Sequence, residues 1–276
     1  MPVDQEKCRA ALRKLNRQFT RLAHEPSQDD IHRFRTSGRR VEAILSELVA
    51  KPSRNDQKLL KLLSRLRKKA GRVRDLDIQI SLLRNLKIPE GNAHKSHLLE
   101  TLVEERTISE KKLAKAYGKK QLTEGRRRLK RAQAGLEIGK AVEPLILTAR
   151  IMSGLGRDGA PLTEKLLHRY RIAGKRARYV AELAADDPEA KRVVEQLKRM
   201  QDVIGDWHDW LKLLQKGEEL FADVQDSALL VMLRNVTHAK FRQGADALAE
   251  LRNGRPSRKP ASAARAPGRA TKAAAA

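Results

Sequence analysis

Two segments of the chain repeat the same order of histidine and basic side chains. Residues 32–40 read HRFRTSGRR and residues 168–176 read HRYRIAGKR, at an offset of 168 − 32 = 136 positions. The histidine, four cationic positions, an aromatic residue and a glycine coincide without a gap. Residues three and four positions apart lie along one side of a helix, so each segment predicts a histidine-led basic helix face. The duplication indicates a scaffold that presents this face twice.

These side chains suit the binding of phosphate groups. Arginine can hold a phosphate by two parallel hydrogen bonds, lysine offers a point charge, and histidine becomes a stronger donor when it is protonated. Like charges at helical spacing repel one another, so this face destabilises the protein when no anion is bound. A run of bound phosphates would replace the repulsion with attraction. A solvated charged face is the ordinary alternative, but such faces usually mix signs. The duplication therefore favours anion binding.

A second repeat follows each basic segment and ends in an aspartate. Residues 63–66 and 71–75 correspond to residues 197–200 and 205–209, at an offset of 209 − 75 = 134 positions. The two offsets indicate one repeat unit of about 135 residues. Metal binding or general-base chemistry is one interpretation of Asp75 and Asp209. We favour the other, in which both accept hydrogen bonds and orient neighbouring arginines such as Arg74.

The sequence offers little that points to catalysis. The dipeptide His208-Asp209 is similar to the ligand pair of metal-dependent phosphohydrolases, but that chemistry needs further histidine and aspartate ligands in ordered spacing. The copy of this position is Arg74-Asp75, so no metal site is predicted. There is also no glycine loop that ends in Lys-Ser/Thr, and no serine has an evident histidine and acid partner. We expect no enzymatic activity and no cofactor.

Helices must position these residues. Apolar residues at alternating steps of three and four predict a helix with one buried stripe over residues 31–48, and the same register recurs over residues 167–184. Residues 27–30 and 161–164 carry the signals of helix starts. Gly38 and Gly174 fall on the two buried stripes, where each costs about 1 kcal/mol relative to alanine. We expect both glycines to let a neighbouring helix approach closely.

The rest of the chain predicts about four helices per half. An opening helix has its apolar stripe between Leu12 and Leu22 and carries a basic flank beside it, formed by Arg9, Arg13, Arg17 and Arg21. Residues 93–136 are helical with a break near Tyr117-Gly118, and residues 141–152 form a further helix. The tryptophans Trp207 and Trp210 share a helix face and are expected in the core. We expect one domain over residues 1–252, with halves of about 5–120 and 121–252. Residues 253–276, rich in Ala, Pro, Arg and Lys, are expected to be disordered.

Composition limits the class of partner. The 276 residues include 59 Lys and Arg against 34 Asp and Glu, a net charge of +25. Such an imbalance favours a polyanion: nucleic acid, an acidic membrane surface or a phosphate polymer. Aromatic residues make up 3% of the chain, which favours helices packed on helices. The single cysteine, Cys8, fits a reducing, cytoplasmic setting. No uncharged run reaches 18 residues, so no membrane span is predicted, and residues 1–7 do not resemble a secretion signal.

These motifs together resemble the CHAD family, the conserved histidine α-helical domain. The resemblance rests on residues 31–40, 71–77, 167–179 and 197–209, in that order, and it covers most of residues 5–250. It implies an all-α fold of two four-helix bundles related by a pseudo-two-fold axis, with a basic central channel that binds inorganic polyphosphate. It also implies association with polyphosphate granules in a bacterial cytoplasm. Where the family usually has a small or amide residue, this chain has Trp207 and His208, so no polar role is assigned there.

Motif positions carry the family's binding residues onto this chain. The channel residues implied by the resemblance are His32, Arg35, Arg39, Arg40, Arg74, His168, Arg171, Lys175, Arg176 and Arg178. Arg13 and Arg17, with Arg9, are added from helix periodicity alone. We expect a non-catalytic groove that displaces counterions from a flexible phosphate polymer.

Three other functions remain open from the sequence. A nucleic-acid-binding helical protein would use the same cations, although exposed aromatic platforms for bases are scarce in this composition. A metal-dependent phosphohydrolase would release phosphate when a metal is supplied. An adaptor would recruit another protein to granules through its tail or its outer helix faces.

Overall fold

Helices make up the regular structure of the described residues, with one isolated backbone bridge. The computed structural model describes residues 2–22, 27–88, 93–139, 142–155, 161–224 and 227–252. The elements are α1 (Gln5–Arg21), α2 (Gln28–Ala43), the π-helical turn η1 (Ile44–Leu48), α3 (Arg54–Asn85), α4 (Ala93–Ala116), α5 (Lys119–Ala134), α6 (Pro144–Ser153), α7 (Glu164–Ala181), α8 (Pro188–Leu220) and α9 (Ala228–Arg252). The predicted all-α fold is confirmed. The predicted tail, residues 253–276, lies outside the described residues.

Capping residues begin the two basic helices where the sequence predicts them. At α2 the Ser27 hydroxyl accepts from the backbone N–H of Asp30 at 3.1 Å, and the Asp30 carboxylate accepts from the N–H of Ser27 at 3.2 Å. At α7 the Thr163 hydroxyl accepts from the N–H of Leu166 at 3.2 Å. These bonds satisfy N–H groups that have no partner within the helix. The predicted break near Tyr117 is also present, between α4 and α5.

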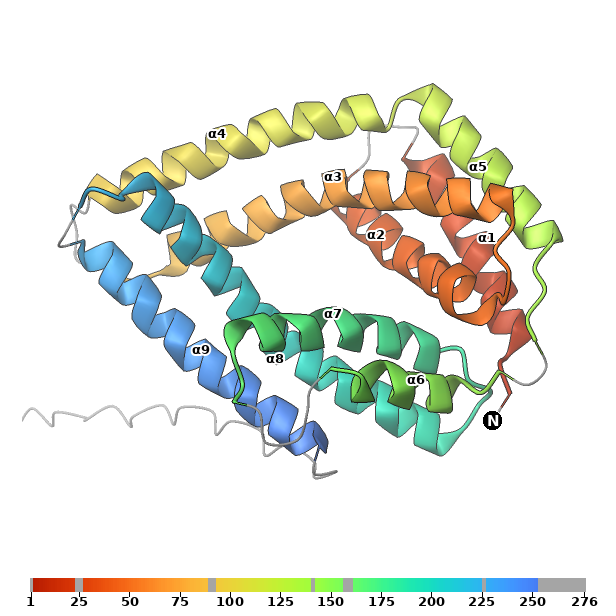
Figure 1. The fold of residues 1–276 in the computed structure, drawn as a ribbon. Coiled ribbons are helices and arrows are strands. Elements are labelled where there is room, and N and C mark those ends of the chain that lie inside the picture. Colours follow the sequence, from red (N-terminus) through yellow and green to blue (C-terminus); the bar gives the residue numbers. More distant parts are fainter. Residues whose placement is uncertain are drawn as a thin grey trace, which may run out of the picture.

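Three clusters of buried apolar side chains hold the helices together. One lies among α1, α2, α3 and α5 and includes Phe19 and Phe34, and another joins α7 to α8 around the fully buried Trp207. The third lies where the far ends of α3 and α4 meet α8 and α9. Figure 1 shows α3 and α4 running from α1, α2 and α5 to this junction. The two halves therefore share a core at one end, and α2 lies against α7 between them.

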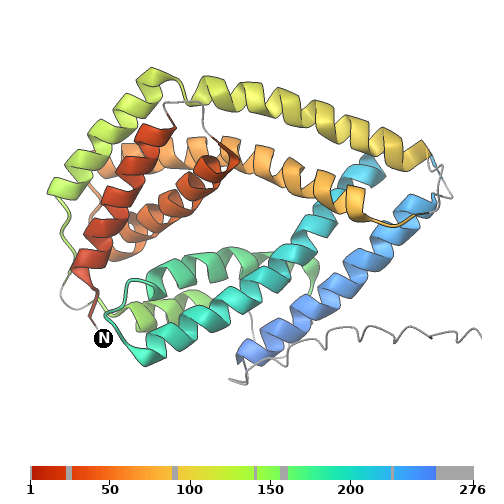
Figure 2. The ribbon, with the colours of Figure 1, turned by 180° about the vertical axis from the view of Figure 1, so that it is seen from behind.

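Helix α5 packs with the first half of the chain. Gly125 lies so close to the Phe19 ring that a Cβ atom at this position would be 2.6 Å from it. This close approach packs α5 against α1, and Figure 2 shows the two helices side by side. Helix α5 also contacts α3. The expected division at residues 120 and 121 would have placed α5 with the second half. In the structure α5 packs instead with the first half, because its buried residues face α1 and α3.

The two repeated glycines differ in their surroundings. Gly174 of α7 contacts the Cε atom of Met200 on α8, so its predicted packing role is confirmed. A Cβ atom at Gly38 of α2 would meet nothing within 4 Å, so the same prediction for Gly38 is wrong. The repeat preserves the residue but not the neighbouring side chain.

Residues before α1 attach to the segment that follows α7. Val3 forms a backbone bridge with Ala184, the N–H of Asp4 donates to the carbonyl oxygen of Leu183 at 2.9 Å, and Lys7 Nζ donates to the Ala184 carbonyl oxygen at 2.7 Å. This contact joins the start of the first half to the second. None of the described helices is both long and apolar enough to cross a membrane.

Candidate functional site

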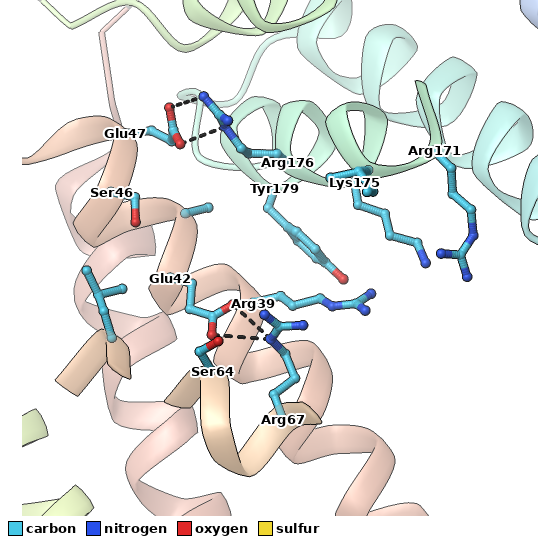
Figure 3. Close-up of a pocket in the computed structure, with 13 residues that line it drawn as sticks. Arg39, Glu42, Ser46, Glu47, Ser64, Arg67, Arg171, Lys175, Arg176 and Tyr179 are labelled. Atoms are coloured by element: carbon cyan, nitrogen blue, oxygen red, sulfur yellow. Dashed lines mark hydrogen bonds and ion pairs between the residues drawn. The ribbon is translucent and has the colours of Figure 1, made fainter. Parts of the chain in front are cut away.

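The facing sides of α2 and α7 bring cations from both halves to one cavity of about 630 Å³. Arg39 comes from α2, Arg67 from α3, and Arg171 and Lys175 from α7 (Figure 3). Arg171 and Lys175 are four positions apart and so lie on one side of α7. Figure 3 shows their side chains directed toward Arg39. Of the four, Arg67 was missed from the sequence.

Five of the described residues that line this cavity are cations, against two carboxylates, those of Glu42 and Glu47. Arg35 of α2 lies beside the cavity, with its guanidinium nitrogen 3.8 Å from an Asp75 oxygen and 15% of its side chain exposed. Burial lowers the pKa of Arg35 and of Arg171, and the negative charge of Asp75 opposes this at both. Asp209 also attracts Arg171. The two aspartates thus act on arginines, as predicted, although the arginine in contact with Asp75 is Arg35 and not Arg74.

Lys175 is the most strongly perturbed cation of the site. Burial lowers its pKa to about 7, and repulsion from Arg171, Arg39 and Arg35 adds to the effect. Neither Lys175, Arg39 nor Arg171 forms an ion pair with another part of the chain that the structure describes. The Nε atom of Arg171 is buried without a hydrogen-bond partner. These are unused positive groups, and an anion would satisfy them.

Carboxylates line the other side of the cavity and neutralise two arginines there. Arg67 Nε donates to Glu42 Oε2 at 2.9 Å, and Arg176 Nε lies 2.7 Å from Glu47 Oε1. Tyr179, which is 4% exposed, lies between these pairs and Lys175 in Figure 3. Arg176 was predicted to bind phosphate; here it reaches across to the opposite half and is paired.

Two more predicted phosphate ligands are paired with Glu182, the C-cap residue that follows α7. Arg40 Nε lies 2.7 Å from one Glu182 oxygen, and Arg178 Nε lies 3.5 Å from the other. Neither arginine lines the cavity of Arg39 and Lys175. Because Glu182 is four residues after Arg178, it lies on the same side of the helix, and the row of basic side chains on α7 ends at this acidic residue.

The two repeated histidines lie near the N-terminal ends of their helices and do not line the cavity. His168 stacks on His208 of α8, with ring centroids 4.9 Å apart. Burial and the mutual repulsion of the two rings lower the pKa of His168, and burial lowers that of His208. His32 is exposed and lines a small hollow with Arg74. Each histidine thus neighbours the residue at the equivalent position of the second repeat, Arg74 or His208.

The arginines predicted from the periodicity of α1 lie apart from this site. Arg13 and Arg17 are exposed, Arg13 forms an ion pair with Glu6, and neither lines the cavity. Of the predicted residues, the structure brings Arg39, Arg171, Lys175 and the paired Arg176 to the cavity, with Arg35 beside it. It adds Arg67, whose position at the cavity depends on how α3 packs and could not be predicted from the repeated motif.

The geometry defines the class as an all-α protein with a cationic cavity between two helices that carry the same sequence motif. The profile of the CHAD domain family matches residues 6–216, and the chain belongs to this family. Its fold is similar to that of the CHAD domain from the plant Ricinus communis (19% identity, 88% of each chain covered, TM-score 0.57). It is also similar to PptA from Streptomyces chartreusis (14% identity, 92% of this chain and 99% of that one covered, TM-score 0.64). A search of curated proteins finds no significant match.

Proposed function

We propose that this protein binds inorganic polyphosphate, without catalysis, in the cavity between α2 and α7. The observation that carries the proposal is the convergence of Arg39, Arg171 and Lys175 from both halves, none of which forms an ion pair with a carboxylate among the described residues. The buried Nε atom of Arg171 lacks an acceptor. A phosphate oxygen supplies that acceptor and offsets the repulsion among the cations.

A linear phosphate polymer suits the arrangement of these cations. Its units are equivalent, so adjacent phosphates can contact Arg39 on α2 and Lys175 on α7 in more than one register. The release of counterions from the polymer supplies much of the free energy of binding, which therefore weakens as salt rises. Nucleic acid is the second candidate, and the net charge of +25 favours it equally. Against it, Tyr179 is the one aromatic side chain that lines the cavity within the described parts of the chain, and it is buried and offers no face on which a base could stack.

Arginine-to-alanine substitutions inside and outside the cavity test the proposal. We expect Arg39→Ala and Arg171→Ala each to weaken binding to purified polyphosphate about tenfold or more, and to reduce the slope of log K against log salt by about 1. The matched controls are Arg13→Ala and Arg17→Ala, which remove the same charge from α1. Equal losses in all four variants, or binding that does not respond to salt, would overturn the proposal. Competition with duplex DNA at matched phosphate concentration separates the two candidate polymers.

In the cell, the proposed activity places the protein in the cytoplasm at polyphosphate granules. A fluorescent fusion is expected to accumulate at granules, and the Arg39→Ala/Arg171→Ala double variant to spread through the cell. Deletion of residues 255–276 tests the adaptor function, because granule association that depends on this segment would place recruitment outside the cavity. Assay of the purified protein for phosphate release, with and without divalent metal ions, tests the absence of catalysis.

A further inference from the structure

A second cationic hollow lies between α3 and α5. It has a volume of about 820 Å³, and its basic lining residues are Arg65 of α3 and Lys119, Lys120 and Arg127 of α5. Near the start of α3 the side-chain amide of Asn55 donates to the carbonyl oxygen of Arg128 on α5 at 2.9 Å. Further along α3, Arg65 lines the groove with Lys119 at the start of α5, so the two helices run in opposite directions along the groove. We call this hollow the α3–α5 groove.

The α3–α5 groove is positively charged with little internal compensation. Arg65, Lys119 and Lys120 are exposed and form no ion pair with any described residue. The acidic residue that lines the groove is Glu124, and its carboxylate is paired with Arg127 and Arg128. The groove therefore repeats the main property of the central cavity, which is an excess of unpaired cations.

The two cationic hollows lie on opposite sides of the same stretch of α3. Leu60, Ser64 and Arg67 line the central cavity, and steps of four and three place them on one face of the helix. Leu62 and Arg65, three positions apart, line the α3–α5 groove. At about 100° per residue these two faces are more than a quarter turn apart. Helix α3 thus forms the wall that separates the hollows.

Lysines cover the exposed side of that wall. Lys61 and Lys68 are seven positions apart, and so they lie on one face of α3, between the face of Ser64 and the face of Arg65. Both are exposed, and neither forms an ion pair within the described ranges. Cations therefore follow one another around α3 from Arg67 to Arg65. The path is roughly half the circumference of a helix that is about 10–12 Å wide with its side chains, or roughly 16–19 Å.

We propose that one long polyphosphate chain occupies the central cavity and the α3–α5 groove together, crossing α3 over Lys61 and Lys68. This inference rests on the proposed function of the central cavity and adds a preference for long chains. The groove offers exposed lysines and few fixed donors, so it binds weakly alone. Once a chain is held in the cavity, its remaining length stays at high local concentration near the groove and the second contact strengthens the first. A chain too short to span α3 gains nothing from the groove.

Charge-removing variants of the crossing and the groove test this inference. The groove variant is Lys61→Gln/Arg65→Gln/Lys68→Gln/Lys120→Gln, and all four residues are exposed. The matched control is Arg192→Gln/Lys198→Gln/Arg199→Gln/Arg242→Gln, which removes four exposed cations from α8 and α9. Each protein is titrated with tripolyphosphate and with long-chain polyphosphate, and melting curves verify that both variants remain folded.

We expect the groove variant to lose about tenfold or more in affinity for the long chain and to bind tripolyphosphate as the unmodified protein does. The control variant is expected to lose less for the long chain. Equal losses in the two variants would overturn the inference, because net charge alone would explain them. Loss of duplex DNA binding with unchanged long-chain binding would also overturn it. The function of the cavity is judged separately, by the effect of Arg171→Ala on tripolyphosphate binding.

Discussion

Arg176 of α7 and Glu47 of η1 form a two-contact ion pair between the halves of the protein, at 2.7 Å (Nε to Oε1) and 3.0 Å (Nη2 to Oε2). The equivalent residue of the first half, at 176 − 136 = 40, is Arg40, and it pairs with Glu182 at the end of α7. Each copy of the motif therefore uses its last arginine to hold the opposite half. This position stabilises the interface, whereas the positions of Arg39 and Lys175 leave their charges available.

Substitutions at these positions should separate stability from binding. We expect Arg40→Ala to lower the melting temperature, because it leaves the partly buried Glu182 with fewer donors. Arg176→Ala should change polyphosphate affinity by less than about fivefold, since its charge is already paired. Arg171→Ala should do the reverse and reduce affinity with little loss of stability. Isothermal titration and thermal melts check the three variants, and equal affinity losses for Arg176→Ala and Arg171→Ala would contradict the assignment.

The affinity for polyphosphate should depend on pH through Lys175. Its pKa in the free protein is about 7. Below that pH the lysine is already charged and binds phosphate directly. Above it, binding requires proton uptake, so affinity falls as pH rises from 7, by up to about tenfold per pH unit for this group. Arginine stays charged over this range, and Lys175→Arg should flatten the profile. A profile that is unchanged in the variant would show that another group titrates.

The same shift in pKa affects folding. The unfolded chain holds a proton on Lys175 up to a pH near 10.5, whereas the folded protein releases it near 7. Between these values the unfolded state binds more protons, so this group's destabilising effect is full below pH 7 and shrinks as pH rises toward 10.5. Melting temperatures of the Lys175→Met variant across this range should show a smaller increase with pH than those of the unmodified protein.

Removal of a carboxylate from the cavity should strengthen polyanion binding. In Glu42→Gln the guanidinium of Arg67 loses its anionic partner and becomes available to phosphate. We expect tighter binding and a salt slope steeper by about 1, because one more counterion is released. Glu6→Gln, which frees Arg13 on α1 away from the cavity, is the control. If both variants bind equally more tightly, the gain reflects net charge and not Arg67.

Two glycine-to-alanine substitutions should have opposite effects on stability. At Gly38 a Cβ atom meets nothing within 4 Å, so Gly38→Ala should stabilise the protein by up to about 1 kcal/mol through the better helix propensity of alanine. At Gly125 the Cβ would lie 2.6 Å from the Phe19 ring, so Gly125→Ala should destabilise by about 1–3 kcal/mol. Chemical denaturation measures both. A destabilised Gly38→Ala variant would mean that this site has no room for a methyl group.

The helices could be predicted from the sequence because their causes are local. Apolar spacing and the hydroxyl caps of Ser27 and Thr163 act within a few residues, and the structure has both helices where these signals place them. The convergence of Arg39 with Lys175 follows from repetition, since two copies of one face can meet across an interface. The pairing of Arg176 could not be predicted in this way, because Glu47 is 129 positions distant and approaches only when the halves pack. Arg67 was missed for the same reason.

The backbone contact of Val3 with Ala184 also constrains how the protein assembles on the ribosome. The two residues are 184 − 3 = 181 positions apart, so at about 5–20 residues per second Ala184 is synthesised roughly 10–40 s after Val3. During that interval the residues around Asp4 have no native acceptor at Leu183. The residues before α1 therefore gain these contacts only after residue 184 has been translated, whereas α1 itself can already pack on α2 and α5. Nascent chains stalled before residue 184 should show the residues around Asp4 poorly protected from proteases.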